Sequence, residues 1–189
     1  DADGAAGTWS SFTPIAILKN HLVSDIQATN FKQGYNPNGS NDGLKITGSE
    51  MADILSGGNF SDTILGLAGD DSISGGYGAD KLFGDTGNDT LRGEEGSDEI
   101  DGGDGNDLLI DTGMSGNNSL IGGSGNDTIS TLSSGKNLLK AGEGDDSIQA
   151  GSGTDTLMGE DGNDVFYIED KNYGMGTLHS VHADGGNGD

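Results

Sequence analysis

A repeat of about nine residues dominates the chain between Gly48 and Tyr167. Each of thirteen consecutive units follows the pattern G-x-x-G-x-D-x-U-x, in which U is a large apolar residue. The clearest copies are GLAGDDSIS (66–74), GDTGNDTLR (84–92), GGDGNDLLI (102–110) and GGSGNDTIS (122–130). The eighth position is apolar in every unit: Leu55, Ile64, Ile73, Leu82, Leu91, Ile100, Leu109, Leu120, Ile129, Leu139, Ile148, Leu157 and Phe166. A run with one fixed period predicts a repeat fold in which every unit has the same local structure.

This nonapeptide resembles the calcium-binding repeat of the RTX (repeats-in-toxin) family, and the resemblance covers about two thirds of the chain. It implies an all-β fold, a parallel β-roll (a β-solenoid) of about thirteen nonapeptide half-coils with multiple Ca2+ ions in its turns. It also implies a bacterial protein exported by a type I secretion apparatus, and therefore an extracellular or cell-surface location. We expect residues 1–47 to form an N-terminal cap or a linker to an upstream domain, and residues 48–167 to form the β-roll. Residues 168–189 should form an extended strand, a loop and the start of a further truncated repeat.

The pattern also predicts how each unit is built. The x-U-x triplet is a short strand, and strand alternation sends U to the interior while its two neighbours point outward. The six residues before each strand must reverse the chain tightly, and glycine at the first and fourth positions would supply φ values that other residues resist. The first position is Gly in ten units, Ala in two and Leu132 in one.

One unit is half a coil, so consecutive turns fall on alternate edges of the roll and units two apart stack at about 4.8 Å. This places the sixth-position residues in two rows. The first edge carries Asp53, Asp71, Asp89, Asp107, Asp127, Asp146 and Asp164, and the second edge carries Asp62, Asp80, Asp98, Asn118, Asn137 and Asp155. Carboxylates at this spacing repel by about 0.9 kcal/mol per pair even in water. Calcium, a hard ion that takes about six to eight oxygens, removes the repulsion. The eleven aspartates are therefore the predicted metal ligands.

Backbone carbonyls of the turns are expected to complete the calcium coordination. The resemblance implies that each ion takes two stacked carboxylates and carbonyl oxygens of the glycine turns, such as those of Gly66, Ala68, Gly69, Gly84, Thr86, Gly87, Gly102, Asp104, Gly105, Gly122, Ser124 and Gly125.

The two edges differ in composition. The fifth position of the first edge is Asp or Asn from the third unit onward, whereas the second edge has Ser61, Ala79, Ser97, Asn117, Lys136 and Thr154. Both Asn replacements at the ligand position also lie on the second edge, and so do both breaks in the period, Asp111-Thr112 and Thr131. A neutral Asn cannot bridge two ions as a carboxylate can. The sequence therefore predicts a second edge that is poor in metal in its middle.

Composition narrows the possible partners. The chain has a formal net charge of −24, with 37 glycines and no cysteine. Such a charge disfavours nucleic acid and anionic membranes as partners and favours a multivalent cation. Without cysteine there is no disulfide framework, and bound metal is the usual alternative. No segment reaches the ~20 apolar residues of a membrane span.

The flanking segments give weaker signals. Thr13-Pro14, followed by apolar residues at three- and four-residue steps up to Ile26, fits an N-capped amphipathic helix, although 15–18 could equally be a strand. After the array, Val165-Phe166-Tyr167-Ile168 reads as a longer strand and 178–183 as a returning one, in which His179 and His182 would point to opposite faces and form no zinc site. The last five residues begin a further unit, from which we expect a fragment of a larger protein.

The sequence carries no catalytic motif that we can identify, so we expect a structural module that folds on calcium binding outside the cell rather than an enzyme. Two alternatives from other functional classes stay open. In the first, the array is the C-terminal module of a secreted enzyme of the metalloprotease, lipase or alginate epimerase type and docks on an upstream domain. In the second, it is part of an adhesin or surface-layer protein that binds an acidic polysaccharide or a cell surface.

Overall fold

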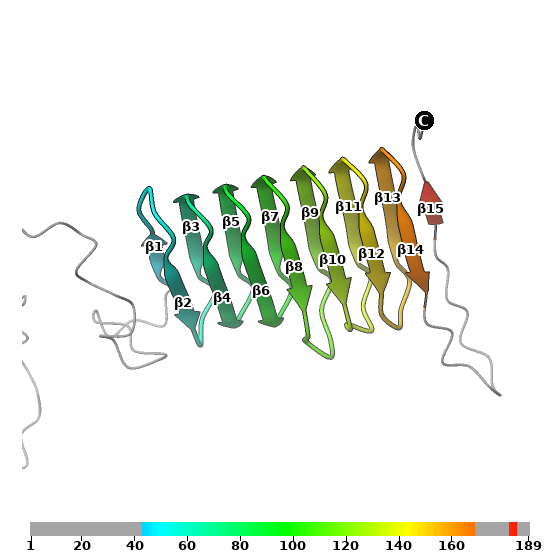
Figure 1. The fold of residues 1–189 in the computed structure, drawn as a ribbon. Helices are drawn as coiled ribbons and strands as arrows, with labels where there is room; N and C mark the ends of the chain where they lie inside the picture. Colours follow the sequence, from blue (N-terminus) through cyan, green and yellow to red (C-terminus); the bar gives the residue numbers. More distant parts are fainter. Residues whose placement is uncertain (1–42, 169–181, 185–189) are drawn as a thin grey trace, which may run out of the picture.

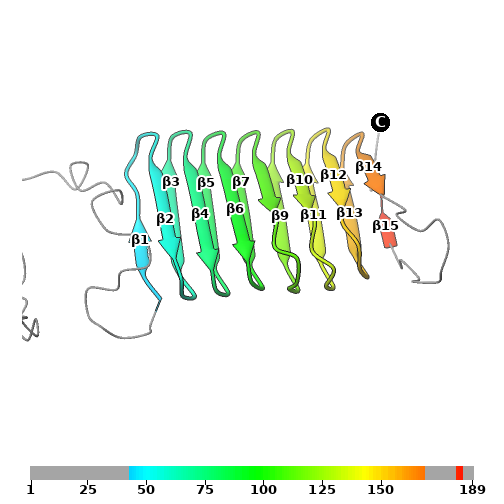
Figure 2. The ribbon, with the colours of Figure 1, turned by 90° about the horizontal axis from the view of Figure 1, so that it is seen from below.

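The computed structural model describes residues 43–168 and 182–184, which form two parallel β-sheets stacked face to face along one axis (Figures 1 and 2). The larger sheet has eight strands in the order β1-β3-β5-β7-β9-β11-β13-β15. Their bounds are β1 (Lys45–Thr47), β3 (Thr63–Ala68), β5 (Lys81–Thr86), β7 (Glu99–Asp104), β9 (Ser119–Ser124), β11 (Leu138–Glu143), β13 (Thr156–Asp161) and β15 (His182–Asp184).

The second sheet has seven strands in the order β14-β12-β10-β8-β6-β4-β2. Their bounds are β2 (Ile54–Gly58), β4 (Ser72–Tyr77), β6 (Thr90–Glu95), β8 (Leu108–Asp111), β10 (Thr128–Thr131), β12 (Ser147–Ala150) and β14 (Val165–Ile168). Consecutive strands belong to opposite sheets, and each strand pairs in parallel with the strand two further along the chain. This topology confirms the predicted parallel β-roll of nonapeptide half-coils.

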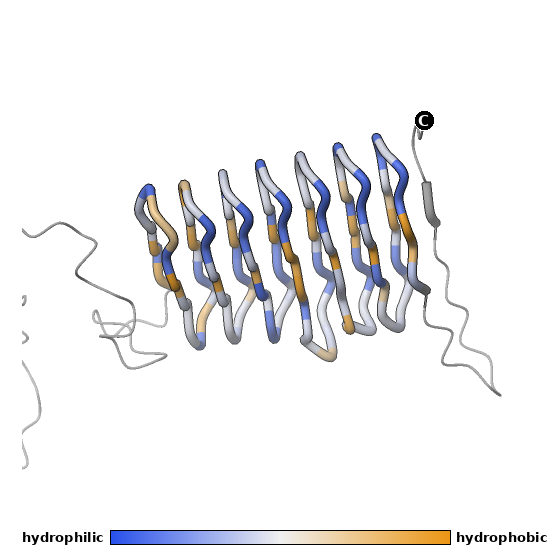
Figure 3. Tube along the Cα trace, viewed as in Figure 1, coloured by the Kyte–Doolittle hydropathy of each residue, from blue (hydrophilic) through white to orange (hydrophobic). Residues whose placement is uncertain are grey.

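The core is a single stripe of eighth-position side chains between the sheets. The pairing register places these residues opposite one another, as in Ile73 with Leu91 and Leu82 with Ile100. Twelve of the thirteen are buried, and Phe166 at the C-terminal end packs partly buried against them. Figure 3 shows these apolar positions recurring along successive strands, with hydrophilic stretches toward the upper row of turns.

Most strands are longer than the predicted x-U-x triplet. Eight strands include the triplet and the first three residues of the next unit, as β5 does from Lys81 to Thr86, whereas β2 and β12 end earlier. Strand pairing through these extra residues is regular, because Asp85 and Thr86 pair with Gly103 and Asp104. The roll therefore has narrower turns and wider sheets than the sequence suggested.

The expected role of the first-position glycines was wrong. The residues with φ in the left-handed region are at the second and fourth positions, for example Gly103 (107°) and Gly105 (139°), whereas the first-position glycines lie outside that region. The second position adopts this conformation even without glycine, at Leu67, Asp85, Glu94 and Glu160. First-position glycine is required for space, because a Cβ added at Gly84 would overlap the Asp89 carboxylate and the Gly102 carbonyl oxygen.

The two breaks in the period follow β8 and β10, which have four residues each where most strands have six. Asp111 and Thr131 are the last residues of β8 and β10, pair with each other and are fully buried. They therefore occupy the inward slot of a first-position residue, and Leu132, which the repeat alignment put in that slot, is 51% exposed. The extra residues after Asp111 make the β8–β9 turn extend beyond its neighbours (Figure 1).

Several expectations fall partly or wholly outside the described residues. These are the N-terminal cap, the helix or strand within 13–26, and His179 with most of the returning strand. Within the described part, β15 pairs with β13 and ends the eight-stranded sheet. None of the described residues forms a helix long and apolar enough to span a membrane.

The single-residue core makes a direct prediction. Ile100 is fully buried in the middle of the stack, whereas Ile54 is 73% exposed at its beginning. Ile100→Ala should lower the free energy of unfolding by about 2–5 kcal/mol because it removes buried methyl groups and leaves a cavity. The same change at Ile54 should cost about 0.5 kcal/mol or less. Urea unfolding in calcium buffer measures both values, and equal losses would contradict this core assignment.

Candidate metal sites

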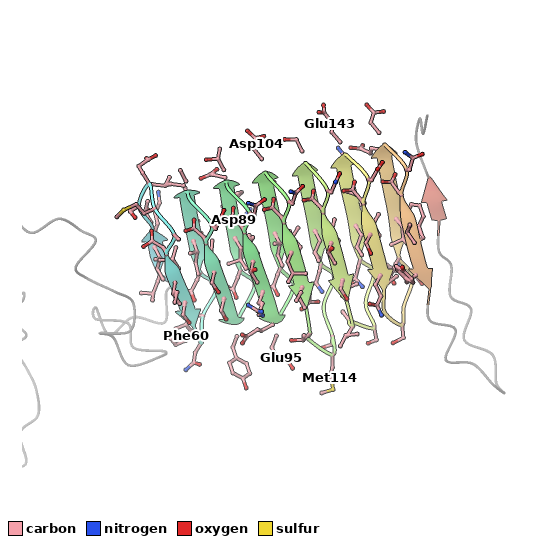
Figure 4. The ribbon with its side chains drawn as sticks, in the orientation of Figure 1. Phe60, Asp89, Glu95, Asp104, Met114 and Glu143 are labelled. Carbon is pink, nitrogen blue, oxygen red and sulfur yellow. The ribbon has the colours of Figure 1, made fainter. Side chains whose placement is uncertain are left out.

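The sixth-position aspartates line the inner side of both rows of turns. The first edge, the upper row in Figure 1, leads into the seven-stranded sheet, and the second edge leads into the eight-stranded sheet. The side chains of Asp71, Asp89 and Asp107 are at most 3% exposed. Figure 4 shows Asp89 among the strands near the upper turns, whereas Asp104 and Glu143 point away from them. The structure thus brings the predicted carboxylates together in two stacked rows.

One oxygen of each stacked carboxylate is held by the backbone. The Oδ1 atom of Asp89 accepts a hydrogen bond of 2.7 Å from the amide of Asp71, and Oδ1 of Asp107 accepts one of 2.7 Å from the amide of Asp89. The same bond links Asp62 to Asp80 on the second edge. These bonds fix each carboxylate at the boundary between two coils.

The other carboxylate oxygen has no partner. Within the described residues, Oδ2 is buried without a hydrogen bond in Asp62, Asp71, Asp80, Asp89, Asp98, Asp107, Asp127, Asp146 and Asp164. Buried polar atoms in native proteins are almost always paired, and an unpaired buried charge is far more costly than an unpaired neutral group. A regular row of such oxygens therefore indicates a ligand that carries positive charge.

Space and a second kind of oxygen adjoin each Oδ2. A Cβ added at Gly66, Gly84 or Gly102 would overlap the Oδ2 atom of its own turn. The same added atom would also crowd a first-position carbonyl of the next coil, that of Gly84, Gly102 or Gly122. First-position carbonyls from the predicted ligand set thus lie beside the unpaired carboxylate oxygens.

The remaining predicted carbonyls have other surroundings. The third-position carbonyls of Thr86, Asp104 and Ser124 accept hydrogen bonds of 2.9, 2.8 and 2.7 Å from Gly69, Gly87 and Gly105 of the preceding coil. Fourth-position carbonyls, such as that of Gly87, lie against the Cα of the glycine at the same position one coil later. A carbonyl oxygen has two lone pairs, so the bonded third-position carbonyls keep acceptor capacity.

The oxygen set fits calcium. In residues 43–168 and 182–184, no three acidic, imidazole or thiol side chains come close enough to hold one ion together. An ion between two coils would therefore meet carboxylates from two stacked turns and take its other ligands from backbone carbonyls or water. Calcium accepts many carboxylate and carbonyl oxygens in irregular geometry, whereas zinc prefers four nitrogen or sulfur ligands.

Burial makes the unliganded carboxylates reluctant to ionise. Desolvation raises the pKa of Asp71, Asp80, Asp98 and Asp107 to about 6, and that of Asp127 to about 7. The backbone hydrogen bonds lower these pKa values, and neighbouring aspartates in the row add to the rise. A bound cation would offset both unfavourable effects, because it stabilises the ionised form.

The first unit and the two Asn units lack this unpaired oxygen. Oδ2 of Asp53 accepts hydrogen bonds from the amide (2.6 Å) and hydroxyl (2.8 Å) of Ser49. The Asn118 amide nitrogen donates to Asp111, and that of Asn137 donates to Oδ1 of Asp155 at 2.8 Å. Protein groups therefore satisfy these side chains where the regular turns leave an oxygen open.

The fifth position forms a second, exposed ladder on the first edge. Oδ1 of each residue accepts the backbone amide of the next coil, from Asn88 onto Asp70 (2.8 Å) to Asn163 onto Asp145 (2.9 Å). These bonds from Asn163 lower the pKa of the Asp145 carboxyl. On the second edge, Ser61, Ser97 and Asn117 make the equivalent bond. The two edges therefore differ at the fifth position in the side chains that accept these backbone hydrogen bonds. These bonds lie outside the rows of sixth-position residues.

Sequence reasoning missed one buried carboxylate beside the second row, that of Asp111. Its carboxylate is fully buried, and desolvation raises its pKa. The sequence pattern predicts that Asp111 is an insertion before a turn, because the repeat aligns on the glycine that follows it. Counting residues from the preceding strand would have found it. Ile110 pairs with Arg92, so the next residue, Asp111, corresponds to Gly93, which is the first residue of its unit.

Comparison with known families agrees with this geometry. The family model described as the RTX calcium-binding nonapeptide repeat matches four times, at residues 47–76, 74–109, 112–133 and 131–166. A comparison with curated proteins finds no match to the chain. RTX nonapeptide repeats bind Ca2+ and are structural rather than catalytic, and the rows of buried aspartates fit that ligand. The chain belongs to the RTX calcium-binding nonapeptide repeat family.

Proposed function

We propose that this β-roll is a calcium-driven folding module of a secreted bacterial protein, largely disordered without calcium and assembled when calcium binds between its stacked turns. The observation that carries the proposal is the row of buried, unpaired Oδ2 atoms. Folding without a cation would bury these oxygens either charged and unpaired or protonated. Binding free energy therefore becomes folding free energy.

The proposed ligands follow from the geometry of the gaps between stacked turns. On the first edge, ions would lie between successive members of the row Asp71, Asp89, Asp107, Asp127, Asp146 and Asp164, with first-position carbonyls as further ligands. On the second edge, the dependable group is Asp62, Asp80 and Asp98. Asp53 and Asp155 stand at or beyond the ends of these groups, and both have protein partners.

The charge of the chain supports folding outside the cell. The formal net charge is −24, and only two ion pairs, Lys81–Glu99 and Lys140–Glu160, occur among the described residues. Self-repulsion would keep such a chain extended where free calcium is scarce, as in the cytoplasm, and so competent for export. Extracellular calcium modules bind at about 10⁻⁴–10⁻³ M, which suits a fold that forms only after secretion.

The first test is removal of the metal. Circular dichroism in EDTA should show a largely disordered chain, and millimolar calcium should produce the β-sheet spectrum in one cooperative transition, because each coil depends on its neighbours. Magnesium at the same concentration should fold the chain poorly, since it demands near-octahedral geometry and retains water. A β-rich spectrum that does not change on chelation would contradict the proposal.

A second test separates ligand aspartates from surface aspartates. Asp107→Asn keeps the Oδ1 atom that accepts the Asp89 amide but removes the charge and the open oxygen. We expect it to lower the free energy of unfolding in calcium by about 1–3 kcal/mol, the range for a buried group that loses its partner. Asp85→Asn is the matched control, because the Asp85 side chain is exposed and lies outside both the row and the predicted carbonyl ligands. Its effect should stay within about 0.5 kcal/mol. Equal effects would mean that bulk charge, rather than the row, binds calcium.

The raised pKa values predict opposite pH dependences with and without calcium. In EDTA, the native carboxyls of Asp107 and Asp127 have pKa values of about 6 and about 7, above the value of 3.8 for a free side chain. The folded form then binds more protons than the unfolded form, so its stability is greatest below pH 3.8 and is lost as the pH rises toward 7. β-Structure in EDTA should therefore increase on acidification. In calcium, acidification should unfold the chain, because the ligands must be ionised. Circular dichroism across pH 4–8 checks both slopes, and parallel slopes would contradict the assignment.

A further inference from the structure

The gap between two regular turns has three parts. Between turn 84–89 and turn 102–107, these are the open Oδ2 of Asp89, the Gly84 Cα, which bears no side chain, and the carbonyl of Gly102. The two oxygens approach the Gly84 Cα so closely that an added Cβ would lie 2.3 Å from Oδ2 of Asp89 and 2.4 Å from the Gly102 carbonyl oxygen. The same three parts recur at Gly57, Gly66 and Gly102.

One gap on the second edge is built differently. Between turn 111–118 and turn 131–137, Asn118 stands in place of the aspartate, Asp111 in place of the first glycine, and Thr131 in place of the second. The register supports this correspondence, because Asp111 pairs with Thr131 and Asn118 accepts the amide of Asp98 at 2.8 Å. The backbone stacking is retained, while the aspartate and both first-position glycines are replaced.

These three residues satisfy one another. Oδ2 of Asp111 accepts hydrogen bonds from the Asn118 amide nitrogen and from the Thr131 hydroxyl (3.2 Å), and its Oδ1 accepts the amide of Gly113 at 3.0 Å. All three side chains are buried, and Asp111 carries its carboxylate at a position that is glycine in most units. The Asn118 nitrogen, which points a donor into the gap, would repel a cation.

Adjoining groups continue the same arrangement. The Thr131 hydroxyl accepts the amide of Ser133 at 3.1 Å, and the Ser133 hydroxyl donates to the carbonyl of Gly116 at 3.0 Å. The backbone amide of Asn118 donates to Oδ1 of the Asn137 side chain at 3.0 Å. Hydrogen bonds between side chains and backbone thus link these two stacked turns from the inside.

We propose that Asp111, Asn118 and Thr131 form a clamp that replaces calcium in this gap, so that the calcium-dependent part of the second edge, Asp62 to Asp98, is joined to the coils that follow it by a link that needs no metal. The inference rests on the proposed function for the regular turns. Asp111 is the residue that sets where along the edge calcium does not bind. The two halves of the roll remain coupled through the clamp when the flanking gaps are only partly filled with calcium.

A double-mutant cycle tests the clamp. Asn118→Asp would place two carboxylates against each other, and Asp111→Asn would place two amides against each other, so either single change leaves a buried group without its partner. At a calcium concentration where the natural protein is half folded, each should lower the ratio of folded to unfolded protein about tenfold. The double variant D111N/N118D restores donor and acceptor in reversed order, and the ratio should return to within about threefold of the starting value.

The control is Asn117→Asp, which adds the same charge one residue away on an exposed side chain and keeps the oxygen that accepts the Lys136 amide. It should change the ratio less than about threefold. Effects of the two single variants that simply add in D111N/N118D would overturn the clamp, as would equal effects of Asn117→Asp and Asn118→Asp.

A count of bound calcium by equilibrium dialysis completes the test. D111N/N118D should bind as many ions as the natural protein, and a loss of one ion would show that Asp111 is a calcium ligand, which overturns the clamp. Failure of the clamp and failure of the proposed function remain distinguishable. If only the clamp is wrong, the natural protein still folds with calcium and the double-mutant cycle shows no coupling between Asp111 and Asn118. If the proposed function is wrong, EDTA does not unfold the protein, and urea unfolding still measures the coupling between these two residues.

Discussion

The burial of one carboxylate oxygen in each regular half-coil, with no protein group to pair it, is the constraint on which the rest of this structure depends. Oδ1 of each stacked aspartate accepts a backbone amide from the preceding coil, which leaves Oδ2 pointing into the gap between turns. Such oxygens are unstable as free charges, and their raised pKa values express this. In the proposed function, a divalent ion that accepts many oxygens is therefore part of the fold rather than an addition to it.

The other features of the roll follow from the same need. First-position glycines leave the gap open, and left-handed residues at the second and fourth positions turn the backbone within a few residues. The core is only one side chain thick, so hydrophobic burial per coil is small and neighbouring coils supply much of the stability. On the first edge, the exposed fifth-position Asn and Asp side chains add hydrogen bonds between coils. These bonds do not involve the sixth-position aspartates.

The two edges solve the same problem in different ways. The first edge repeats one turn with little variation, so its unpaired oxygens form one continuous row from Asp71 to Asp164. The second edge changes chemistry in its middle, where an amide replaces a carboxylate and an inserted carboxylate meets that amide. Charge neutralisation by an ion and charge satisfaction by hydrogen bonds are thus alternatives at equivalent positions of one array.

The sequence by itself determined the period, the parallel roll, the interior stripe and the two rows of stacked aspartates, because a strict repeat leaves few ways to bury one apolar residue in nine. It also located the irregular middle of the second edge through Asn118, Asn137 and the extra residues. Only the tertiary structure decided which oxygen of each aspartate is free, that first-position glycine provides space rather than a special φ, and that Asp111 faces inward. These properties depend on contacts between residues about eighteen to twenty positions apart, which local patterns do not encode. An insertion in particular can extend the strand before it or the turn after it, and only the pairing of Asp111 with Thr131 resolves that choice.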